Sequence, residues 1–357
     1  MVMRVAIVGC GLIGQKRMRS LGEHRLVAVA DTNAARAEAL AAHVRGCRAH
    51  TDWQSVVRSP EVDAVIVATT NDALATVTRA ALQHGKHVLV EKPAARSMKE
   101  LAPVASAAQS AGVCVKVGFN HRFHPAFVRA RTIVDSGELG SLMYVRGRYG
   151  HGGRLGYERE WRADPAISGG GELLDQGVHL IDLARWFLGD FEEVHGHIAT
   201  FFWNMPVEDN GFLCLTTSAG QVAWLHASCT EWKNTFSFEI FGCHGKLQVD
   251  GLGGSYGVER LTHYRMLPQM GPPETTTWEY PDGDQSWSAE FAHFSECISQ
   301  RRQPSGTLHD ALEGLRVVES VYAQCRSAIR ENPAMNQRSC HQLRSETCED
   351  RLPRMAL

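Results

Sequence analysis

The chain has 357 residues, of which 44% are hydrophobic and 21% are charged. These values are typical of a soluble globular protein, and the length is sufficient for two domains. The formal net charge of -2 gives no electrostatic reason to expect nucleic acid or an anionic membrane as a partner. No apolar run approaches the roughly 18 residues that a membrane-spanning helix needs. The cysteines include no Cys-x-x-Cys pair and no secretory leader precedes them, so we expect a cytoplasmic protein with reduced thiols.

A glycine-rich turn follows the first predicted strand. Residues 4–8 have the apolar pattern of a buried strand, and Gly9, Gly11 and Gly14 then form a G-x-G-x-x-G motif before a helix-compatible segment. In this motif the first glycine permits a tight turn, the second lets the backbone approach a pyrophosphate, and the third lets the helix pack close to the strand. The free N–H groups at the start of the helix suit phosphate oxygens. We therefore predict a dinucleotide-binding turn made by Gly9, Gly11, Leu12, Ile13 and Gly14.

The acidic residue that such a fold places on the ribose is also present. A second predicted strand, residues 26–30, ends in Asp31, which lies 22 residues after Gly9. A carboxylate at this distance can accept hydrogen bonds from a ribose diol. It would repel a 2′-phosphate, and no arginine follows it directly, so NAD is favoured over NADP. Arg36 is near enough to keep NADP as the less favoured alternative.

Predicted strands and helices continue to alternate through the first third of the chain. The strands are residues 62–68, 87–90 and 113–119, and the helices between them are residues 73–84 and 98–111. This order predicts a parallel, doubly wound sheet, in which ligands bind beyond the carboxyl ends of the strands. Besides Gly9 and Asp31, the residues at such ends are Thr69, Thr70, Asn71, Glu91, Lys92 and Asn120.

The pattern changes in the second half of the chain. Residues 194–280 are rich in Thr, Val, Phe and Trp, with turn signals at Asn210-Gly211, Ala219-Gly220 and His244-Gly245. This spacing predicts strands in an antiparallel meander. We therefore expect an α+β domain with one large, mostly antiparallel open sheet.

These patterns give an α/β protein with three parts. Residues 1–120 are predicted to form a Rossmann domain, and residues 121–330 an α+β domain for substrate binding and oligomerisation. Two late helices, residues 287–301 and 308–330, are expected to pack back on the body. Residues 331–357 are polar and aperiodic, and are predicted to be a loosely ordered tail.

An acid and an imidazole begin a later helical segment. Asp175 and His179 stand four residues apart at the start of the apolar-periodic residues 173–188. On a helix, positions four apart share a face. A carboxylate beside an imidazole can fix its tautomer and raise its basicity, which a proton-transfer catalyst needs. The alternative interpretation is an ordinary polar pair on the solvated face of a helix.

Three local motifs together resemble a known family. They are the glycine motif at residues 9–14, the Glu-Lys-Pro run at residues 91–93, and the run from three glycines to Asp-x-x-x-His at residues 169–179. In this combination the chain resembles the glucose–fructose oxidoreductase and inositol dehydrogenase family. The resemblance extends from residue 1 to about residue 330, and it includes residues 118–125 and the Trp161-Arg162 pair.

The resemblance implies both a fold and an activity. The fold is a Rossmann domain followed by an α+β domain whose open sheet often forms a homodimer or homotetramer interface. The activity is NAD(P)-linked oxidation or reduction of a sugar, nucleotide sugar or cyclitol. The catalytic group that the resemblance implies is Lys92, Asp175 and His179. The residues that it places around the nicotinamide are Thr69, Asn71, Glu91 and Asn120.

The chemistry of alcohol oxidation agrees with these roles. The nicotinamide takes the hydride, and the protein must supply a proton acceptor. His179 is predicted to be the general base, since the unperturbed pKa of histidine is about 6.5. Asp175 is predicted to orient the ring of His179 or to bind a neighbouring hydroxyl. Lys92 is predicted to hydrogen-bond the reacting oxygen and stabilise alkoxide charge.

Further residues are assigned to the substrate and cofactor from their place near these motifs. Trp161, Arg162, Arg154 and Tyr157 flank the catalytic segment, and either line the mouth of the site or pack its loop. The residues predicted to bind substrate are Lys92, Arg122, Arg154, Tyr157, Asp175, Gln176 and His179; Trp161 and Arg162 are placed on the cofactor side. No metal site is predicted, because the histidines do not show ligand spacing.

Two other functions fit the same residues. The first is an enzyme that keeps its NAD and recycles it during glycoside cleavage or epimerisation. Net accumulation of NADH would separate a dehydrogenase from such an enzyme. The second is a non-catalytic NAD or sugar sensor, which has no need for Lys92, Asp175 and His179 together.

Overall fold

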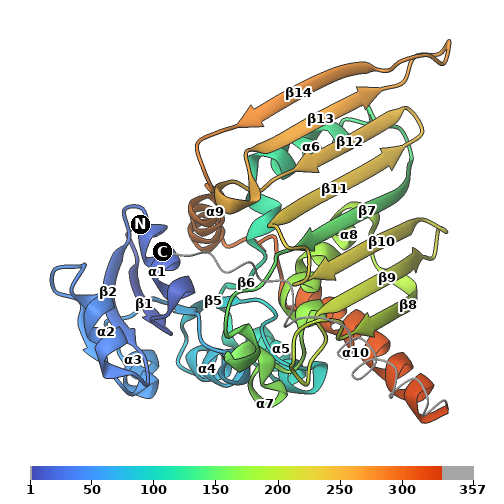
Figure 1. Cartoon of the computed structure of the whole chain (residues 1–357). Coiled ribbons are helices and arrows are strands. Elements are labelled where there is room, and N and C mark those ends of the chain that lie inside the picture. The colour runs from blue at the N-terminus through green and yellow to red at the C-terminus, as the bar shows by residue number, and fades with distance from the viewer. Residues whose placement is uncertain (1, 332–357) are drawn as a thin grey trace, which may run out of the picture.

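The computed structural model describes residues 2–331, together with the side chains up to residue 325 (Figure 1). The proposed tail lies outside the described residues from residue 332 onward. Two sheets organise the chain, one parallel and one mostly antiparallel, and helices lie between and around them.

The N-terminal sheet confirms the predicted Rossmann architecture. It has six parallel strands in the order β3-β2-β1-β4-β5-β6. The strands are β1 (Arg4–Val8), β2 (Arg25–Ala30), β3 (Arg48–His50), β4 (Ala64–Val67), β5 (His87–Glu91) and β6 (Val115–Gly118). The two central strands, β1 and β4, are almost entirely buried, as expected for a sheet that is covered on both faces.

Helices alternate with these strands, and several begin at a residue that caps them. They are α1 (Leu12–Arg19), α2 (Ala34–Ala41), α3 (Trp53–Arg58), α4 (Asn71–Gln83) and α5 (Met98–Ala111). The side chains of Asn33, Asp52 and Ser97 each accept a hydrogen bond from a backbone N–H in the first turn of α2, α3 and α5. Such caps satisfy donors that a helix leaves unpaired at its start.

The second sheet is large and mostly antiparallel, as predicted, but it is not a simple meander. Its eight strands run in the order β14-β13-β12-β11-β7-β10-β9-β8, and β7 pairs in parallel with β10. Its strands are β7 (Leu142–Gly150), β8 (Phe191–Ala199), β9 (Asn210–Thr217), β10 (Val222–Ser228), β11 (Thr235–Gly242), β12 (Gly245–Asp250), β13 (Glu259–Arg265) and β14 (Glu274–Tyr280). β7 comes before α8 and the other strands of this sheet in the chain, yet it lies between β11 and β10 at the centre of the sheet. Local sequence does not specify this position, so it depends on tertiary packing.

One predicted turn is wrong. Asn210 and Gly211 begin β9 and pair with β10 instead of forming a turn. The Asn210 side-chain amide donates to Asp209 and Thr230, which holds it at the start of the strand. A Cβ atom on Gly211 would lie 3.1 Å from Cβ of Leu173. The glycine therefore permits close packing of another segment against the strand.

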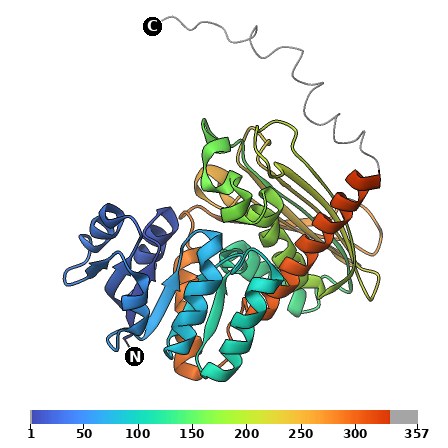
Figure 2. The ribbon, with the colours of Figure 1, turned by 90° about the horizontal axis from the view of Figure 1, so that it is seen from below.

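Helices cover one face of the second sheet. In Figure 1, α6 (Pro125–Asp135) and α8 (Val178–Leu188) lie behind the sheet, and the face toward the viewer is bare. Figure 2 shows α10 (Leu308–Glu331) lying along the sheet beside the helices of the first domain. The short elements are η1 (Asn120–Phe123), η2 (Tyr157–Arg159), η3 (Trp161–Ala163), α7 (Pro165–Ser168), the π-helical turn η4 (Leu173–Gly177) and η5 (Gly254–Tyr256).

The other late helix, α9 (Ser286–Gln300), packs on the first domain even though it belongs to the range predicted for the second. Its Phe291 and Phe294 are buried in one cluster with Val5 and Ile7 of β1. The chain therefore crosses from the second sheet back to the Rossmann sheet. As a result, a helix from the range predicted for the second domain packs on the first domain.

A buried ionic cluster ties α9 to the strands behind the proposed site. Arg17 of α1 donates to Glu91 of β5 at 2.6 Å and to Glu290 of α9 at 2.6 Å. The ammonium group of Lys116 in β6 lies 3.2 Å from the Glu290 carboxylate. The side chains of Arg17, Lys116 and Glu290 are 0% exposed, so each charge depends on its partners for stabilisation.

We predict that Glu290→Gln destabilises the protein by about 3–5 kcal/mol, because it leaves two buried cations without one of their counter-ions. Chemical unfolding followed by circular dichroism measures this change. Arg48→Gln is the control, since Arg48 pairs with Glu61 on the exposed surface and exposed pairs contribute little. Equal stability of both variants would contradict the role given to the cluster.

Candidate active site

Two cations hold Asp175 at the carboxyl edge of the Rossmann sheet. Lys92 directly follows β5, and its Nζ donates to the backbone oxygen of Asp175 at 2.6 Å and to Oδ1 at 2.5 Å. Nε of Arg162 donates to the other carboxylate oxygen at 3.0 Å. Burial tends to raise the pKa of Asp175, but Lys92 and Arg162 together hold that pKa below its usual range. Asp175 is therefore ionised, and it joins the first domain to the second.

The expected contact between Asp175 and His179 is not made. Asp175 lies in the π-helical turn η4, and His179 lies in the first turn of α8. No hydrogen bond joins these two side chains within residues 2–325. The physical reason is that Asp175 has two charged donors, whereas burial keeps His179 neutral and so a weaker competitor.

His179 instead contacts a second histidine. Its Nδ1 atom lies 2.7 Å from Nδ1 of His121, which belongs to η1. Both rings are buried. Burial, followed by the charge of Lys92, lowers the pKa of His179 well below its ordinary value. Burial and His179 likewise lower the pKa of His121. Burial thus favours the uncharged form of both imidazoles.

The glycine motif has the geometry that a dinucleotide needs. Gly9 has φ +98°, and a Cβ atom there would lie 2.3 Å from the Ala68 carbonyl oxygen. A Cβ atom on Gly14 would lie 2.0 Å from the Gly9 carbonyl oxygen. Gly11, by contrast, has open space beside it at the start of α1. The residues thus fit a pyrophosphate that approaches the backbone over Gly11.

Asp31 lies next to this turn. Its Oδ2 accepts a hydrogen bond from the Cys10 N–H at 2.8 Å, and its Oδ1 accepts one from the Asn33 N–H at 2.9 Å. A carboxylate has about four lone-pair sites, so further acceptor capacity remains for a ribose diol. Leu12 and Ile13 form the first turn of α1, and the side chain of Leu12 is exposed.

The strand-end residues divide into two groups. Thr69 and Thr70 lie between β4 and α4, and Asn71 is the first residue of α4. The Thr70 hydroxyl donates to Asp72, and the Asn71 amide donates to the Ser168 carbonyl oxygen at 2.8 Å. They remain candidates for the cofactor crevice. Asn71 also joins the two domains, because Ser168 belongs to α7.

Glu91 and Asn120 are engaged by the protein itself. The Glu91 carboxylate is buried against Arg17, and the Asn120 amide donates to the Ser286 hydroxyl at 2.8 Å. The carboxylate of Glu91 therefore has a structural role inside the protein, in an ion pair with Arg17. Its separation of 74 residues from Arg17 explains why the local motif did not indicate this partner.

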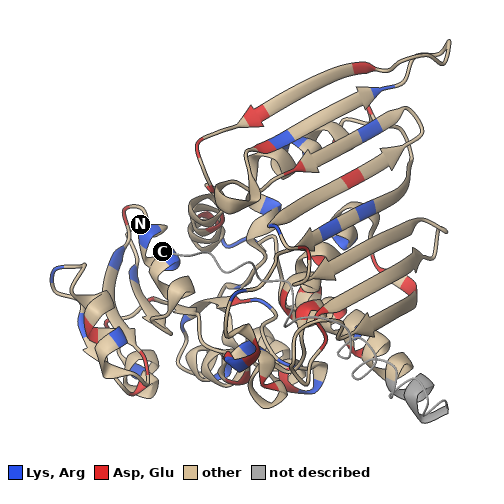
Figure 3. Cartoon of the chain, in the orientation of Figure 1, with Lys and Arg blue, Asp and Glu red and all other residues tan. Residues whose placement is uncertain are grey.

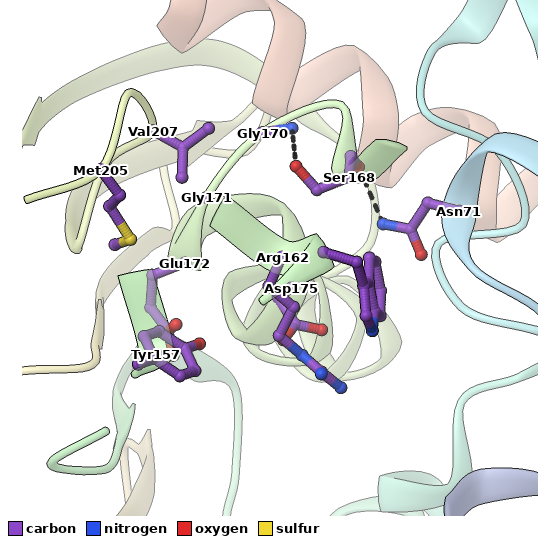
Figure 4. A pocket seen from close by; sticks show the side chains of 11 residues that line it. Asn71, Tyr157, Arg162, Ser168, Gly170, Gly171, Glu172, Asp175, Met205 and Val207 are labelled. Carbon is purple, nitrogen blue, oxygen red and sulfur yellow. Dashed lines mark hydrogen bonds and ion pairs between the residues drawn. The ribbon is translucent and has the colours of Figure 1, made fainter. Parts of the chain in front are cut away.

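A small pocket opens beside Asp175. Figure 4 shows Arg162 and Asp175 together on one side of it and Glu172 beside Tyr157 on the other. Its volume is about 10 Å³, which is room for roughly one water molecule or one hydroxyl group. The residues that line it are Asn71, Tyr157, Trp161, Arg162, Ser168, Gly170, Gly171, Glu172, Asp175, Met205 and Val207.

Glu172 is a pocket residue that the sequence analysis missed. It is 2% exposed, and burial, together with Asp175 and Glu208, raises its pKa well above the ordinary value. It is therefore a neutral acid that can both donate and accept a hydrogen bond. Only its position three residues before Asp175 could have indicated it.

Of three further residues assigned to the substrate, two form ion pairs with carboxylates of the protein and one has a buried oxygen atom without a partner. Arg122 is buried and donates to Asp182 at 2.8 Å, so it is part of an internal ion pair and not of the pocket. Arg154 is 65% exposed and donates to Glu160 at 2.6 Å. The Gln176 Oε1 atom is buried without a partner in the described part of the chain. Arg122 therefore belongs to the protein interior.

The part of the chain that the structure describes has neither a metal-ligating cluster nor a membrane-spanning helix. Within the described residues, no group of three or more His, Cys, Asp or Glu side chains is arranged to hold a metal ion. None of the described helices is long and apolar enough to cross a membrane. Basic and acidic residues are interspersed over both sheets in Figure 3.

Both domains match models of one family of oxidoreductases. Residues 3–119 match the oxidoreductase family with an NAD-binding Rossmann fold, and residues 127–248 match the GFO/IDH/MocA C-terminal domain. The first of these models describes a family of NAD-binding oxidoreductases. The chain belongs to the GFO/IDH/MocA family.

Individual relatives support this family. Inositol 2-dehydrogenase 2 of Saccharopolyspora erythraea is 33% identical over 62% of this chain, and the match spans 65% of that protein, slightly less than two thirds. The scyllo-inositol 2-dehydrogenase (NAD(+)) of Bacillus subtilis is 27% identical over 88% of this chain and 91% of its own length. The crystal structure of aldose-aldose oxidoreductase from Caulobacter crescentus, complexed with glycerol, is 25% identical, with a TM-score of 0.80 over 92% of this chain and 98% of that chain.

We predict that Gly11→Ala raises the dissociation constant for NAD at least about tenfold while the melting temperature stays unchanged. The new methyl group has free space in the protein but projects where the pyrophosphate would approach. Isothermal titration calorimetry and thermal unfolding measure the two quantities. Gly14→Ala is the contrast, since its Cβ atom would clash with the Gly9 carbonyl and lower stability as well. Unchanged NAD binding by Gly11→Ala would contradict the assigned pyrophosphate position.

Proposed function

We propose that this protein is an NAD-dependent dehydrogenase that acts on a secondary hydroxyl, or the corresponding keto group, of a sugar, nucleotide sugar or cyclitol. The observation that carries the proposal is the ion pair of Lys92 with Asp175 at the carboxyl edge of the Rossmann sheet, where His179 also packs edge-on against Phe119, directly after β6, with ring centroids 6.4 Å apart. These groups come from distant segments, and a structural role alone does not require a partly accessible ammonium group beside a neutral imidazole.

Lys92 has one donor left for the reacting oxygen. An ammonium group has three N–H bonds, and the side chain and backbone oxygens of Asp175 take two of them. The third has no hydrogen-bond partner among the described residues, and the side chain is 17% exposed. Lys92 would use this N–H to stabilise negative charge on the substrate oxygen, and Asp175 fixes its direction.

His179 would accept the hydroxyl proton. Its lowered pKa keeps the ring neutral at physiological pH, so a nitrogen with a free lone pair is available without prior deprotonation. A low pKa also makes the ring a weak base, and the nearby charge of Lys92 offsets this by favouring the alkoxide.

The cofactor supplies hydride transfer when it is bound, and the chain's own residues place it. Gly9, Gly11 and Gly14 would provide the turn for the pyrophosphate, and Asp31, beside this turn, would accept hydrogen bonds from the ribose. The carboxylate of Asp31 favours NAD over NADP, because it would repel a 2′-phosphate.

The relatives support the proposed class of substrate. Two of them are named as inositol dehydrogenases, and the solved structure is named as an aldose oxidoreductase. A polyhydroxylated ring needs several polar partners, and Glu172, Tyr157, Arg162 and Asn71 offer them beside Asp175.

Lys92→Met and His179→Asn should each reduce kcat at least about 100-fold, the lower end of what acid–base groups contribute, while NAD binding is retained. Turnover is followed by NADH absorbance with a panel of cyclitols and sugars. His84→Asn, on the exposed surface, is the control. Retained turnover would remove either residue from its role, and turnover without net NADH would favour the cofactor-recycling alternative.

We also propose that a second copy of the chain covers the bare face of the eight-stranded sheet. Tyr144 and Phe241 stack on this face with ring centroids 4.2 Å apart, and Trp224 of the neighbouring strand β10 is 57% exposed. On the neighbouring strands β7 and β11, Arg146 and Glu239 form an ion pair with each other. Exposed aromatic side chains and arginine are enriched at protein interfaces.

Trp224→Asp should shift the protein toward smaller species, because a charge would replace an exposed apolar ring in the contact. Light scattering after gel filtration measures the mass. Met270→Asp, which changes another exposed apolar residue between β13 and β14, should leave the mass unchanged. A wild-type protein that elutes as a monomer would rule out this interface.

A further inference from the structure

The contact between His121 and His179 determines where their protons lie. The two Nδ1 atoms are 2.7 Å apart, a distance at which one must donate and the other accept. Both rings are neutral because both are buried, so each carries a single N–H. The pair therefore has two arrangements, and in each the rings have opposite tautomers.

Only one arrangement leaves His179 able to act as a base. If His121 donates, Nδ1 of His179 uses its lone pair in the contact and Nε2 carries the hydrogen. If His179 donates, its Nε2, on the other side of the ring, has the free lone pair. Nε2 of His179 makes no hydrogen bond to the described residues, so it is the nitrogen left for a substrate.

We propose that His121 is the positioning residue for His179, and that it accepts the Nδ1–H of His179 and so keeps Nε2 of His179 as the proton acceptor. The importance of this contact for catalysis rests on the proposed function. When Nε2 takes a proton from the substrate hydroxyl, His179 becomes an imidazolium, and its Nδ1–H bond to His121 becomes charge-assisted. The proton returns from Nε2 in the reverse reaction, so His121 need not gain or lose a proton.

The surroundings of His121 prevent its ring from turning away. It stacks on Phe236 of β11 with centroids 5.8 Å apart, and it meets Tyr149 of β7 edge-on at 5.2 Å. The titratable groups that face the two rings are Lys92, His124 and Tyr149. None of them is a carboxylate, so His121 takes the position that an acid holds beside many catalytic histidines.

The tautomers can be measured without a substrate. Nitrogen NMR of the full-length protein with 15N-labelled histidine distinguishes a protonated from an unprotonated ring nitrogen. Loss of signals in His121→Asn and in His179→Asn assigns the two rings. We expect protonated Nδ1 and unprotonated Nε2 for His179, and the reverse for His121. Protonated Nε2 on His179 would overturn the proposal even if the enzyme turns over sugars.

Two variants of similar size separate positioning from packing. His121→Asn can still accept from Nδ1 of His179 through its side-chain oxygen, whereas His121→Leu cannot. We expect His121→Leu to lower kcat at least about 100-fold with little change in KM, and His121→Asn to retain kcat within about tenfold. Equal losses in both variants would assign the residue a packing role and overturn the proposal.

Thermal unfolding of both variants checks that they are folded, and the His179 NMR signals of each variant give a second readout. In His121→Asn, Nδ1 of His179 should remain protonated; in His121→Leu this preference should be lost. If no sugar is oxidised by the wild type but the tautomers are as expected, the proposed function fails and the positioning contact stands. If sugars are oxidised and the tautomers are reversed, the positioning contact fails alone.

Discussion

The ion pair between Lys92 and Asp175 is the interaction on which the site depends. It joins the end of a Rossmann strand to the π-helical turn that precedes α8, so one contact sets the relative position of the proposed site groups from both domains. Arg162 binds the second oxygen of the same carboxylate, which leaves Asp175 with a cation on each side. Because water is largely excluded, these attractions are stronger than they would be on the surface.

Burial opposes the charged form of every ionisable group in the site, and the neighbouring charges determine which groups remain charged. Asp175 remains ionised because two cations compensate for its burial, whereas Glu172, three residues earlier, is protonated because Asp175 and Glu208 oppose its charge. His121 and His179 are neutral because burial and Lys92 oppose their protonation. The environment of each group thus favours one protonation state, the ionised form for Asp175 and the neutral form for Glu172, His121 and His179.

A late segment of the chain packs against the first strand and supports the site. The helix α9 packs on β1 after the second sheet is complete, and Glu290 closes the cluster of Arg17, Glu91 and Lys116. Glu91 directly precedes Lys92, so a buried ion pair behind the strand anchors the backbone from which the Lys92 amine extends. In the Glu-Lys-Pro run, Glu91 therefore has a structural role, whereas Lys92 lies in the proposed site.

The sequence alone determined the features that depend on neighbouring residues. The turn at Gly9 to Gly14, the alternation of strands and helices, and Lys92 at a strand end all follow from local sterics and periodicity. Only the tertiary structure decided which side chains meet. His121 lies 58 residues from His179, and Arg122 lies 60 residues from Asp182. No local pattern specifies such partners, because burial and competition among distant charges select them.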